Sequence, residues 1–535
     1  MRPKNRRIVK TIIFLLFILT TCSQAKITKG PFLLRVEQNR AALMWESDIE
    51  GPGKLSYGIN QVSKNNIVTV PERIKYEVVG QDGLSTQKTV FIHKTWVENL
   101  KEDCVYFYRV ADPNHSAKTY NFHTQSPDAN QITFAVYGDS RTYPENHQKI
   151  IEQIRKHNVD FVVNSGDVVT RGEIYPLWSK EFFEPLKGLA EFVPVYTIKG
   201  NHDISQQGYF EKLLVPPGQT ANYSFDYGPL HYYCADNYSG TEPEVLDMIV
   251  ADMNNTTSPW KFVSYHIPSL NFGGHWSSWG YPDALSAFSK ANIDFVITGH
   301  SHQFEWFHPI APASDTNEHY VTYITSGGGG ARLYDIEPTY YHVNAKGVHH
   351  FCLFRIDASK IERKVIQVDN LLMRFINIKG KHIGHTDWLK ANGKLGRQFT
   401  MYSLPLELVQ FHQNLYHTCP MTLPKKPQKN QPFKLIYKLS VPPLDRQIEI
   451  KFNLRAEPGH YKLPEPKTVV IPKQGGDIDI EFTVTALIEV ELSADKYGRP
   501  KPITPYLVAD CSYKLGKKQE LISKRVHAKQ PENPR

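Results

Sequence analysis

Five apolar runs in the middle of the chain each end in side chains that can bind a metal ion. In an open α/β sheet, ligands bind beyond the carboxyl ends of the strands, so the loops that follow neighbouring strands meet in one crevice. Glycines precede most of these side chains, as expected where a chain turns sharply after a strand. The runs and the residues that follow them are 132–137 with Asp139, 161–165 with Asp167, 193–198 with Asn201 and His202, 262–265 with His266, and 295–298 with His300 and His302.

The segments between these runs include stretches with helical periodicity. Residues 145–156, for example, place Ile150, Ile151 and Ile154 on one face of a helix. Apolar strands that alternate with helices predict a layered α/β fold. We expect this unit to cover residues 128–369.

The candidate ligands form a mixed set of carboxylates, one amide and imidazoles. A single aspartate after a strand is more often a helix cap, and a single histidine is more often a polar group with a structural partner. Five matches in order along the chain argue against that explanation for the set. Such a set suits two divalent or trivalent metal ions, which bind a phosphoryl group and lower the pKa of a bridging water to make hydroxide. The predicted metal ligands are Asp139, Asp167, Asn201, His266, His300 and His302.

The order of these motifs, GD, GD, GNHD, a histidine after a strand and GHSH, resembles the calcineurin-like metallophosphoesterase superfamily. Two features are similar to its purple acid phosphatase branch. Residues 26–127 contain Trp45 in an apolar strand and the run YFYRV at 106–110, as in the fibronectin type III-like domain of that branch. GHSHQFEWF, followed by TSGGGG at 325–330, resembles its closing motif. The resemblance covers about residues 26–360.

The resemblance implies a four-layer β-sandwich flanked by helices and assigns a role to each ligand. Asp167 would bridge two metal ions, which would be Fe, Zn or Mn. Asn201, His266 and His300 would complete one metal site, and Asp139 and His302 would hold the other ion. Two further histidines would act on the substrate: His202 by orienting it or as a general acid, and His275 by contacting the phosphate. His275 lies in a glycine-rich loop, so a plain surface histidine is an equal alternative.

The sequence departs from the family pattern at the first metal site. Where many members have Asp-x-His, Asp139 is followed by Arg141, whose guanidinium stays protonated and cannot ligate a metal. Thr170 stands where purple acid phosphatases have a metal-binding tyrosine, so no purple colour is expected. Arg141 could clamp a substrate phosphate or pair with a carboxylate such as Glu173 or Asp203. His147 could turn inward as an extra ligand or be a polar residue at the start of a helix.

Short alternating runs on both sides of the α/β unit predict two all-β sandwich domains. We expect them at residues 26–127 and 398–535, with a linker at 370–397; the role of the second sandwich is open. The five cysteines after residue 25 are odd in number and lack Cys-x-x-Cys spacing, so they predict neither a disulfide framework nor a zinc ribbon. Cys419 and Cys511 could pair, or the cysteines could be buried thiols.

Residues 1–25 have the pattern of a signal peptide. A basic segment precedes an apolar one, and Ser23-Gln24-Ala25 fits a cleavage site, so we expect a secreted or periplasmic protein. Cys22 offers an alternative, a lipoprotein anchor, and only then would the chain associate with a membrane. Removal of the five basic residues of this segment would lower the formal net charge from +8 to +3, so nucleic acid is not expected as the main partner.

The sequence therefore predicts a phosphoric ester hydrolase, acid-phosphatase-like and acting on small phosphomonoesters at a binuclear centre with an activated bridging hydroxide. One alternative is a phosphodiesterase or nucleotide hydrolase that uses the same centre. Another is a binding or envelope protein whose first metal site has degenerated. Substrate identity, metal identity and oligomeric state are not encoded in any recognisable motif.

Overall fold

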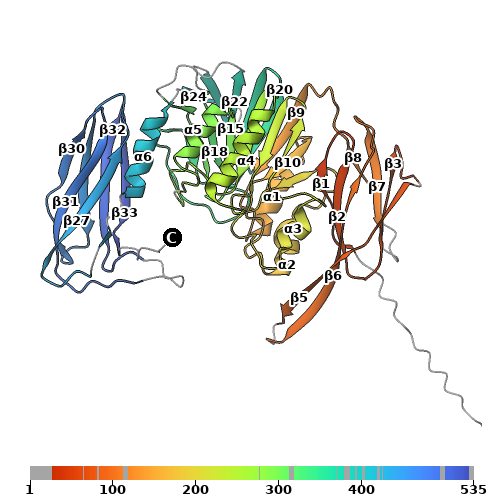
Figure 1. The fold of residues 1–535 in the computed structure, drawn as a ribbon, viewed down its shortest axis with the longest axis horizontal. Coiled ribbons are helices and arrows are strands. Elements are labelled where there is room, and N and C mark those ends of the chain that lie inside the picture. Colours follow the sequence, from red (N-terminus) through yellow and green to blue (C-terminus); the bar gives the residue numbers. More distant parts are fainter. Residues whose placement is uncertain are drawn as a thin grey trace, which may run out of the picture.

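The computed structural model shows three β-rich bodies side by side, in chain order from right to left in Figure 1. It describes residues 27–528 apart from 64, 81–82, 112–117, 276, 313–318, 369, 379–385, 392–393, 401–403, 419–421, 424–425 and 494–500. The predicted signal peptide, with Cys22, and Cys419 lie outside the described residues. None of the helices in the described part is both long and apolar enough to cross a membrane.

The N-terminal body is a sandwich of two four-stranded sheets, which fits a fibronectin-like fold. Inward-facing side chains of both sheets, among them Trp45, Leu55 and Tyr108, form its apolar core. One sheet has the order β1 (Ile27–Val36), β2 (Ala41–Ser47), β6 (Ser85–Val97) and β5 (Glu72–Val79). The other has the order β4 (Asn65–Thr69), β3 (Gly53–Ile59), β7 (Val105–Ala111) and β8 (Tyr120–His123).

The central body contains two sheets packed face to face. Its core is made of large apolar side chains from both sheets, such as Phe134 and Phe262. The first sheet has the order β11 (Val195–Thr197), β10 (Phe161–Asn164), β9 (Gln131–Tyr137), β20 (His350–Asp357), β21 (Lys360–Gln367) and β22 (Asn370–Ile378). The second has the order β12 (Tyr223–Tyr227), β13 (Leu230–Cys234), β14 (Trp260–Tyr265), β15 (Phe295–Thr298), β18 (Thr322–Ser326), β16 (Phe304–Phe307) and β19 (His342–Lys346).

Helices cover the outer face of each sheet and complete four layers. Ile150, Ile151 and Ile154 of α1 (Pro144–Ile154) are buried against the first sheet, as their spacing predicts, and each such burial contributes about 1.5–3 kcal/mol. The same face also carries α2 (Tyr175–Leu177), the π-helix η1 (Trp178–Phe183) and α3 (Tyr209–Leu214). The second sheet is covered by α4 (Glu242–Asn255) and α5 (Asp283–Lys290). The α/β fold class predicted from the sequence is confirmed.

The predicted strands lie next to one another in parallel. β9, β10 and β11 pair in parallel in the first sheet, and β13, β14, β15 and β18 do so in the second. Their carboxyl ends therefore point the same way within each sheet. All five loops that carry predicted ligands leave the sandwich at this edge.

The C-terminal body is also a β-sandwich, preceded by α6 (Leu406–Thr418), a helix that is not predicted from the sequence. Its core is continuous with the apolar side chains around α4 and α5. One sheet has the order β27 (Pro432–Val441), β31 (Gly476–Ala486) and β29 (Tyr461–Lys462). The other has the order β30 (Lys467–Ile471), β28 (Ile448–Ala456), β32 (Leu507–Leu515) and β33 (Lys518–Arg525).

The segment predicted as a linker, residues 370–397, carries strands. β22 extends the first central sheet, and β23 (Thr386–Ala391) forms a hairpin with β24 (Lys394–Thr400). Backbone pairing with β21 is the physical reason that residues 370–378 are ordered as a strand. The domain boundaries stay a prediction. The remaining short pairs are β17 (Ile310–Ala311) with β25 (Leu404–Pro405) and β26 (Thr422–Leu423) with β34 (His527–Ala528).

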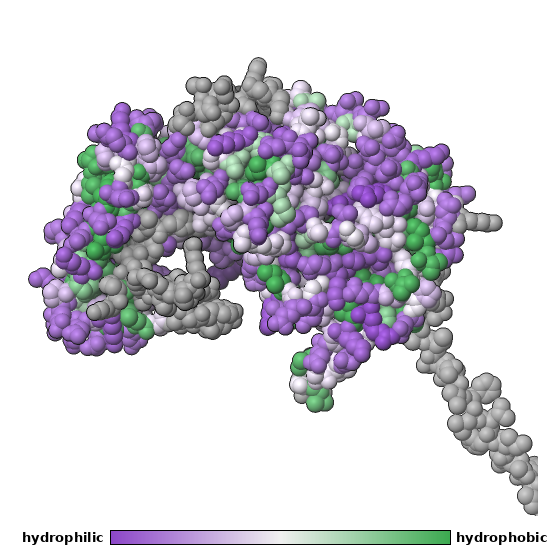
Figure 2. Space-filling model, in the orientation of Figure 1, coloured by the Kyte–Doolittle hydropathy of each residue, from purple (hydrophilic) through white to green (hydrophobic). Residues whose placement is uncertain are grey.

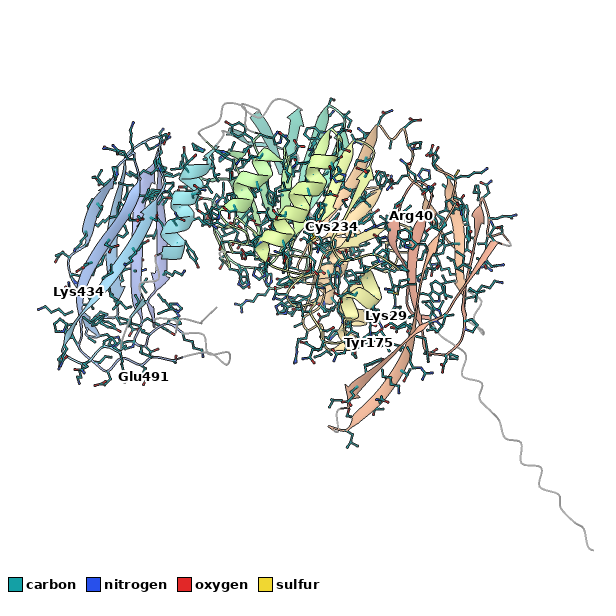
Figure 3. All side chains as sticks on the ribbon, viewed as in Figure 1. Lys29, Arg40, Tyr175, Cys234, Lys434 and Glu491 are labelled. Carbon is teal, nitrogen blue, oxygen red and sulfur yellow. The ribbon has the colours of Figure 1, made fainter. Side chains whose placement is uncertain are left out.

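A buried ionic cluster joins the N-terminal sandwich to the central body. Glu46, on β2, lies 2.5 Å from Nζ of Lys29 and accepts a hydrogen bond from the hydroxyl of Tyr175 on α2. Lys29 and Tyr175 lie together where the two bodies meet (Figure 3).

The surface drawn in Figure 2 is largely hydrophilic, and the protruding tip of the β5–β6 hairpin carries the exposed apolar residues Val79 and Leu84.

Candidate metal centre

The chain turns abruptly after the strands that carry the predicted ligands. Asp139, Asp167 and His300 have φ angles of 57°, 56° and 67°, a left-handed backbone conformation that costs free energy for residues other than glycine. The turns are also crowded, since a Cβ on Gly200 would lie 2.2 Å from Oδ1 of Asp167. Tight turns of this kind aim the side chains back across the ends of the strands.

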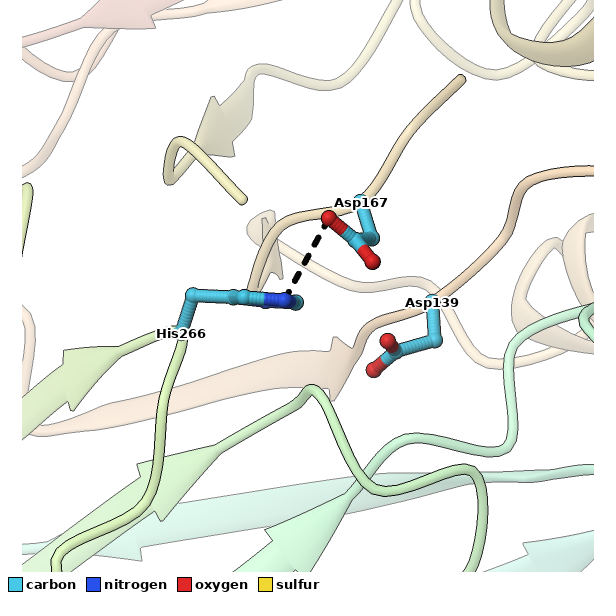
Figure 4. A group of neighbouring side chains, drawn as sticks. All are labelled: Asp139, Asp167 and His266. Atoms are coloured by element: carbon cyan, nitrogen blue, oxygen red, sulfur yellow. Dashed lines mark ion pairs between the residues drawn. The ribbon is translucent and has the colours of Figure 1, made fainter. Parts of the chain in front are cut away.

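Asp139, Asp167 and His266 point toward a common centre (Figure 4). Their ligand atoms lie within 4.8 Å of one another, and Nε2 of His266 is 3.3 Å from Oδ1 of Asp167. All three side chains are buried, and Oδ1 of Asp139 has no hydrogen-bond partner among the described residues. A buried carboxylate oxygen without a partner is costly unless a cation binds it. The geometry of this group therefore fits a metal ion.

Asn201 and His300 extend the group on the side of His266. Oδ1 of Asn201 lies 3.2 Å from Nε2 of His266 and 3.0 Å from Nδ1 of His300. Nδ1 of His266 lies 2.8 Å from the carbonyl oxygen of Ser165, which can only accept, so Nδ1 carries a proton and Nε2 is the nitrogen that can bind a metal ion. These donors, together with Asp167, form a convergent oxygen and nitrogen set that suits Fe, Zn or Mn.

The charges of this group balance one another in the metal-free chain. Burial, together with the neighbouring Asp167, raises the pKa of Asp139 to about 8. Burial opposes charge on Asp167 as well, but attraction by His266, His202 and Arg141 holds its pKa well below the ordinary value. Burial would lower the pKa of His266, yet its two carboxylate neighbours raise it to about 9. A proton on His266 thus supplies positive charge that a bound cation would replace.

The set predicted for the other metal ion is less regular. Nε2 of His302 lies 3.5 Å from Oδ1 of Asp139, and Nδ1 of His302 lies 2.8 Å from the carbonyl oxygen of Arg332. Burial and the charge of Arg141 lower the pKa of His302 to about 4, so its imidazole is neutral. Nε of Arg141 is 3.2 Å from Oδ2 of Asp167, and Nη2 is 3.3 Å from Nε2 of His302. The guanidinium therefore contacts two of the three predicted ligands.

Arg141 does not pair with either carboxylate suggested from the sequence. Asp203 is turned toward the backbone instead, where its carboxylate accepts hydrogen bonds from the amides of Asp167, Val168 and Gly200. This buried carboxylate fixes the loops that carry two of the ligands. Thr170, at the position of the family's tyrosine, donates its hydroxyl hydrogen bond to Glu181.

His147 is not brought to the metal ligands. Its Nε2 lies 2.8 Å from the hydroxyl of Tyr137 and its Nδ1 lies 2.9 Å from the carbonyl oxygen of Glu181. Burial lowers its pKa to about 4, as for a neutral core histidine. Of the two alternatives for His147, the extra metal ligand is the one that fails, because its two ring nitrogens already contact Tyr137 on β9 and Glu181 on η1.

His202 and His275 lie at the rim of the cluster. Nδ1 of His202 is 2.7 Å from the carbonyl oxygen of Thr170, and its Nε2 is 4.0 Å from Oδ2 of Asp167. The ring of His275 stacks on that of His300 with centroids 4.4 Å apart. His275 is therefore part of the site rather than a remote surface residue.

Two tyrosines of the site were missed in the sequence. The hydroxyl of Tyr334 lies 3.0 Å from Nε2 of His275, and its ring stacks on His302 with centroids 4.7 Å apart. Tyr238 donates a hydrogen bond to Oδ1 of Asn201 at 3.4 Å. Neither residue follows a strand with a ligand motif, although Tyr334 lies four residues after the glycine run that packs against the loop of Asp139.

Comparisons with known proteins find a matching family for the central part of the chain. The model of the calcineurin-like phosphoesterase family matches residues 132–304. Purple acid phosphatase 15 of Arabidopsis thaliana is 25% identical over 358 residues, which are 54% of this chain and 66% of that protein. Purple acid phosphatase 21 of the same plant is 29% identical over 278 residues, 47% of this chain and 62% of that protein. The matches thus span less than two thirds of these relatives.

A solved structure shares the fold. Purple acid phosphatase from yellow lupin seeds superimposes with a TM-score of 0.54 over 70% of this chain and 74% of its own, at 17% sequence identity. This chain therefore contains a calcineurin-like phosphoesterase domain and is similar in sequence and in fold to purple acid phosphatases.

Proposed function

We propose that this chain is a metal-dependent hydrolase of small phosphate esters, with monoesters as its main substrates. The observation that carries the proposal is the buried group of Asp139, Asp167 and His266, at the edge where parallel strands end. Within the described residues, one carboxylate oxygen of this group lacks a hydrogen-bond partner. Asn201, His300 and His302 add neutral donors to it. A bound metal ion would polarise a phosphoryl oxygen and lower the pKa of a water molecule.

His202 is suited to deliver a proton to the leaving oxygen of the ester. The carbonyl of Thr170 accepts from Nδ1 and fixes the orientation of the ring, so that Nε2 faces the side of Asp167. General acid catalysis requires a donor group that is held in a fixed position, and this hydrogen bond fixes the ring. We assign this role to His202.

His275 and Arg141 are suited to hold the phosphoryl oxygens. His275 is kept at the rim by its stacking on His300 and by the hydroxyl of Tyr334. Arg141 carries a permanent positive charge beside the cluster, and its guanidinium can bind an oxyanion through more than one N–H group. The binuclear centre stays a prediction. Arg141 contacts two of the residues that are predicted to bind the first metal ion.

The contact of Arg141 with Asp167 and His302 favours a second candidate function. If the guanidinium prevents metal binding altogether, the chain would be a binding protein that retains the fold of a phosphoesterase without its activity. The two candidates differ in measurable turnover. A phosphodiesterase would be recognised by a preference for diesters.

A single assay separates these candidates. Purified protein is loaded with Mn²⁺, Zn²⁺ or Fe²⁺ and tested with p-nitrophenyl phosphate and bis(p-nitrophenyl) phosphate. Hydrolysis of the monoester, lost in Asp167→Asn and His266→Ala but kept in the exposed control His123→Ala, supports the proposal. No turnover of either ester with any metal would overturn it. Faster hydrolysis of the diester would assign the diesterase.

Export is a separate part of the proposal. The basic and apolar segments of residues 1–25 would direct the hydrolase out of the cytoplasm, where it would act on extracellular or periplasmic esters. Sequencing the N-terminus of the mature protein tests this. A first residue at Lys26 supports cleavage after Ala25, and a lipid-modified Cys22 supports an anchored form.

A further inference from the structure

The guanidinium of Arg141 is held firmly at the side of the metal centre where Asp167 and His302 meet. Its Nε lies 3.2 Å from Oδ2 of Asp167, Nη1 lies 3.3 Å from the hydroxyl of Thr142, and Nη2 lies 3.3 Å from Nε2 of His302. The backbone amide of Arg141 also donates to the carbonyl oxygen of Asp167 at 3.2 Å. The side chain is 14% exposed, so it is packed within the protein and does not extend into solvent.

The contact with His302 excludes a metal ion from the same atom. Nδ1 of His302 faces the carbonyl oxygen of Arg332 at 2.8 Å and must therefore carry the proton. Nε2 then has a single lone pair, which can accept a hydrogen bond from Arg141 or bind a metal ion, but not both. Because arginine keeps its proton, the guanidinium cannot yield by becoming neutral.

Asp139 does not need a separate ion. Its carboxylate lies with Asp167 and His266 in a group whose ligand atoms are all within 4.8 Å of one another. Donor atoms on opposite sides of one ion, each about 2.1 Å from it, are about 4 Å apart, so a small inward adjustment would let all three bind one ion. Asn201 and His300 border the same group beside His266.

We propose that Arg141 takes the place of the first metal ion, so that this centre uses one metal ion and one fixed guanidinium where its relatives' pattern implies two ions. The inference rests on the proposed function, because it concerns the same site. The ion would be bound by Asp139, Asp167 and His266 with Asn201 and His300. The guanidinium would supply the second positive charge toward the phosphoryl group, and His302 would hold the guanidinium rather than a metal.

Metal counting on the purified full chain tests this. The protein is stripped with a chelator, reloaded with Mn²⁺, desalted, and analysed by elemental mass spectrometry and electron paramagnetic resonance. We expect one ion per chain and the six-line spectrum of an isolated Mn²⁺. Two ions per chain with a spin-coupled spectrum would overturn the inference, whether or not the protein hydrolyses phosphate esters.

Two variants and one control sharpen the result. Arg141→His replaces the cation with a neutral ligand, and Arg141→Ala removes it, so we expect the Mn²⁺ content to rise toward two ions per chain, more fully in Arg141→His. Arg332→Ala removes an equal charge from an exposed side chain but keeps the backbone carbonyl that His302 faces, so this variant should keep one ion. An unchanged count in both folded Arg141 variants would contradict the inference.

The wild-type chain gives a test that does not depend on the variants folding. Anomalous diffraction at the Mn edge should show one peak among Asp139, Asp167 and His266, with Arg141 still against His302. A second peak beside His302 would overturn the proposal. A chain that binds no metal and hydrolyses no ester would instead refute the proposed function.

Discussion

The carboxylate of Glu46 accepts a hydrogen bond from the hydroxyl of Tyr175 at 2.5 Å, and this contact crosses from the N-terminal sandwich to the central body. Oε2 of Glu46 is also 2.5 Å from Nζ of Lys29, whose side chain is 3% exposed. The pair is thus removed from water, and its two charges depend on each other. Burial lowers the pKa of Lys29, although Glu46 opposes this.

Glu46→Gln should therefore destabilise the chain markedly. It removes the negative charge and leaves the ammonium group of Lys29 buried beside a neutral amide, which costs about 3–5 kcal/mol in comparable pairs. Urea unfolding followed by tryptophan fluorescence measures the loss. Glu50→Gln is the matched control: Glu50 pairs with Arg73 and both side chains are exposed, so we expect a change below about 1 kcal/mol. Equal effects of both substitutions would contradict the assigned role of burial.

Metal binding should raise the thermal stability of the chain. Asp139 and Asp167 are buried side by side, and each raises the cost of charging the other, so a cation at the site favours the folded state. At a free metal concentration about 100 times the Kd, linkage predicts a gain of about 3 kcal/mol. Differential scanning fluorimetry before and after chelation measures this, and Asp167→Asn should respond much less to the metal. If chelation lowers the melting temperature of Asp167→Asn as much as that of the wild-type chain, the stabilising ion binds elsewhere.

The strand-end ligands could be predicted because the signal is local. Each apolar run is long enough for one buried strand and its ligand follows directly. Parallel pairing brings Asp139 and Asp167 together within the first sheet, and the packing of the second sheet against the first adds His266. His147 and Arg141 could not be resolved in this way. The partners of His147 are the Tyr137 hydroxyl and the Glu181 carbonyl, and those of Arg141 are Asp167 and His302. Most of these contacts depend on how distant segments pack.

The difference between local signals and contacts of distant segments also explains which features of the flanking regions could be predicted. Alternating apolar residues predicted both β-rich ends, since one face of each strand is buried in a sandwich. α6 was missed because its apolar positions are buried on more than one side, between the central body and the C-terminal sandwich, and this weakens the helical pattern. Tyr334 was missed because its place beside His275 and His302 is set by a loop, where no periodicity guides a prediction.

His202 should matter most for esters with poor leaving groups. As a general acid it would protonate the leaving oxygen, and this proton is needed less when the leaving group is already stable as an anion. For His202→Ala we expect kcat to fall about 10²- to 10⁴-fold with an alkyl phosphate and much less with p-nitrophenyl phosphate. A plot of kcat against the pKa of the leaving group measures this. An equal loss for all esters would show that His202 binds substrate rather than donating a proton.

His231 should make stability depend on alkaline pH, away from the metal centre. Its Nδ1 lies 2.7 Å from Oδ1 of Asp226 and its Nε2 lies 2.6 Å from Oδ2 of Asp252. Carboxylates only accept, so both nitrogens carry protons and the ring is charged. Burial opposes this charge, but hydrogen bonds to the two carboxylates raise the pKa of His231 to about 9, from an ordinary value of 6.5.

Because the folded-state pKa is the higher one, the stabilisation is complete below about pH 6.5 and is lost as the pH rises through about 9. We therefore expect His231→Gln to lower the free energy of unfolding by about 2 kcal/mol at pH 6 and by much less at pH 10. The control is His123→Gln, at an exposed histidine whose ring lies 3.2 Å from Asp103. We expect it to change the free energy of unfolding by a few tenths of a kcal/mol at either pH. Urea unfolding at the two pH values measures both effects. If His231→Gln lowers the free energy of unfolding equally at pH 6 and pH 10, packing of the ring, and not its charge, stabilises the edge of the second sheet.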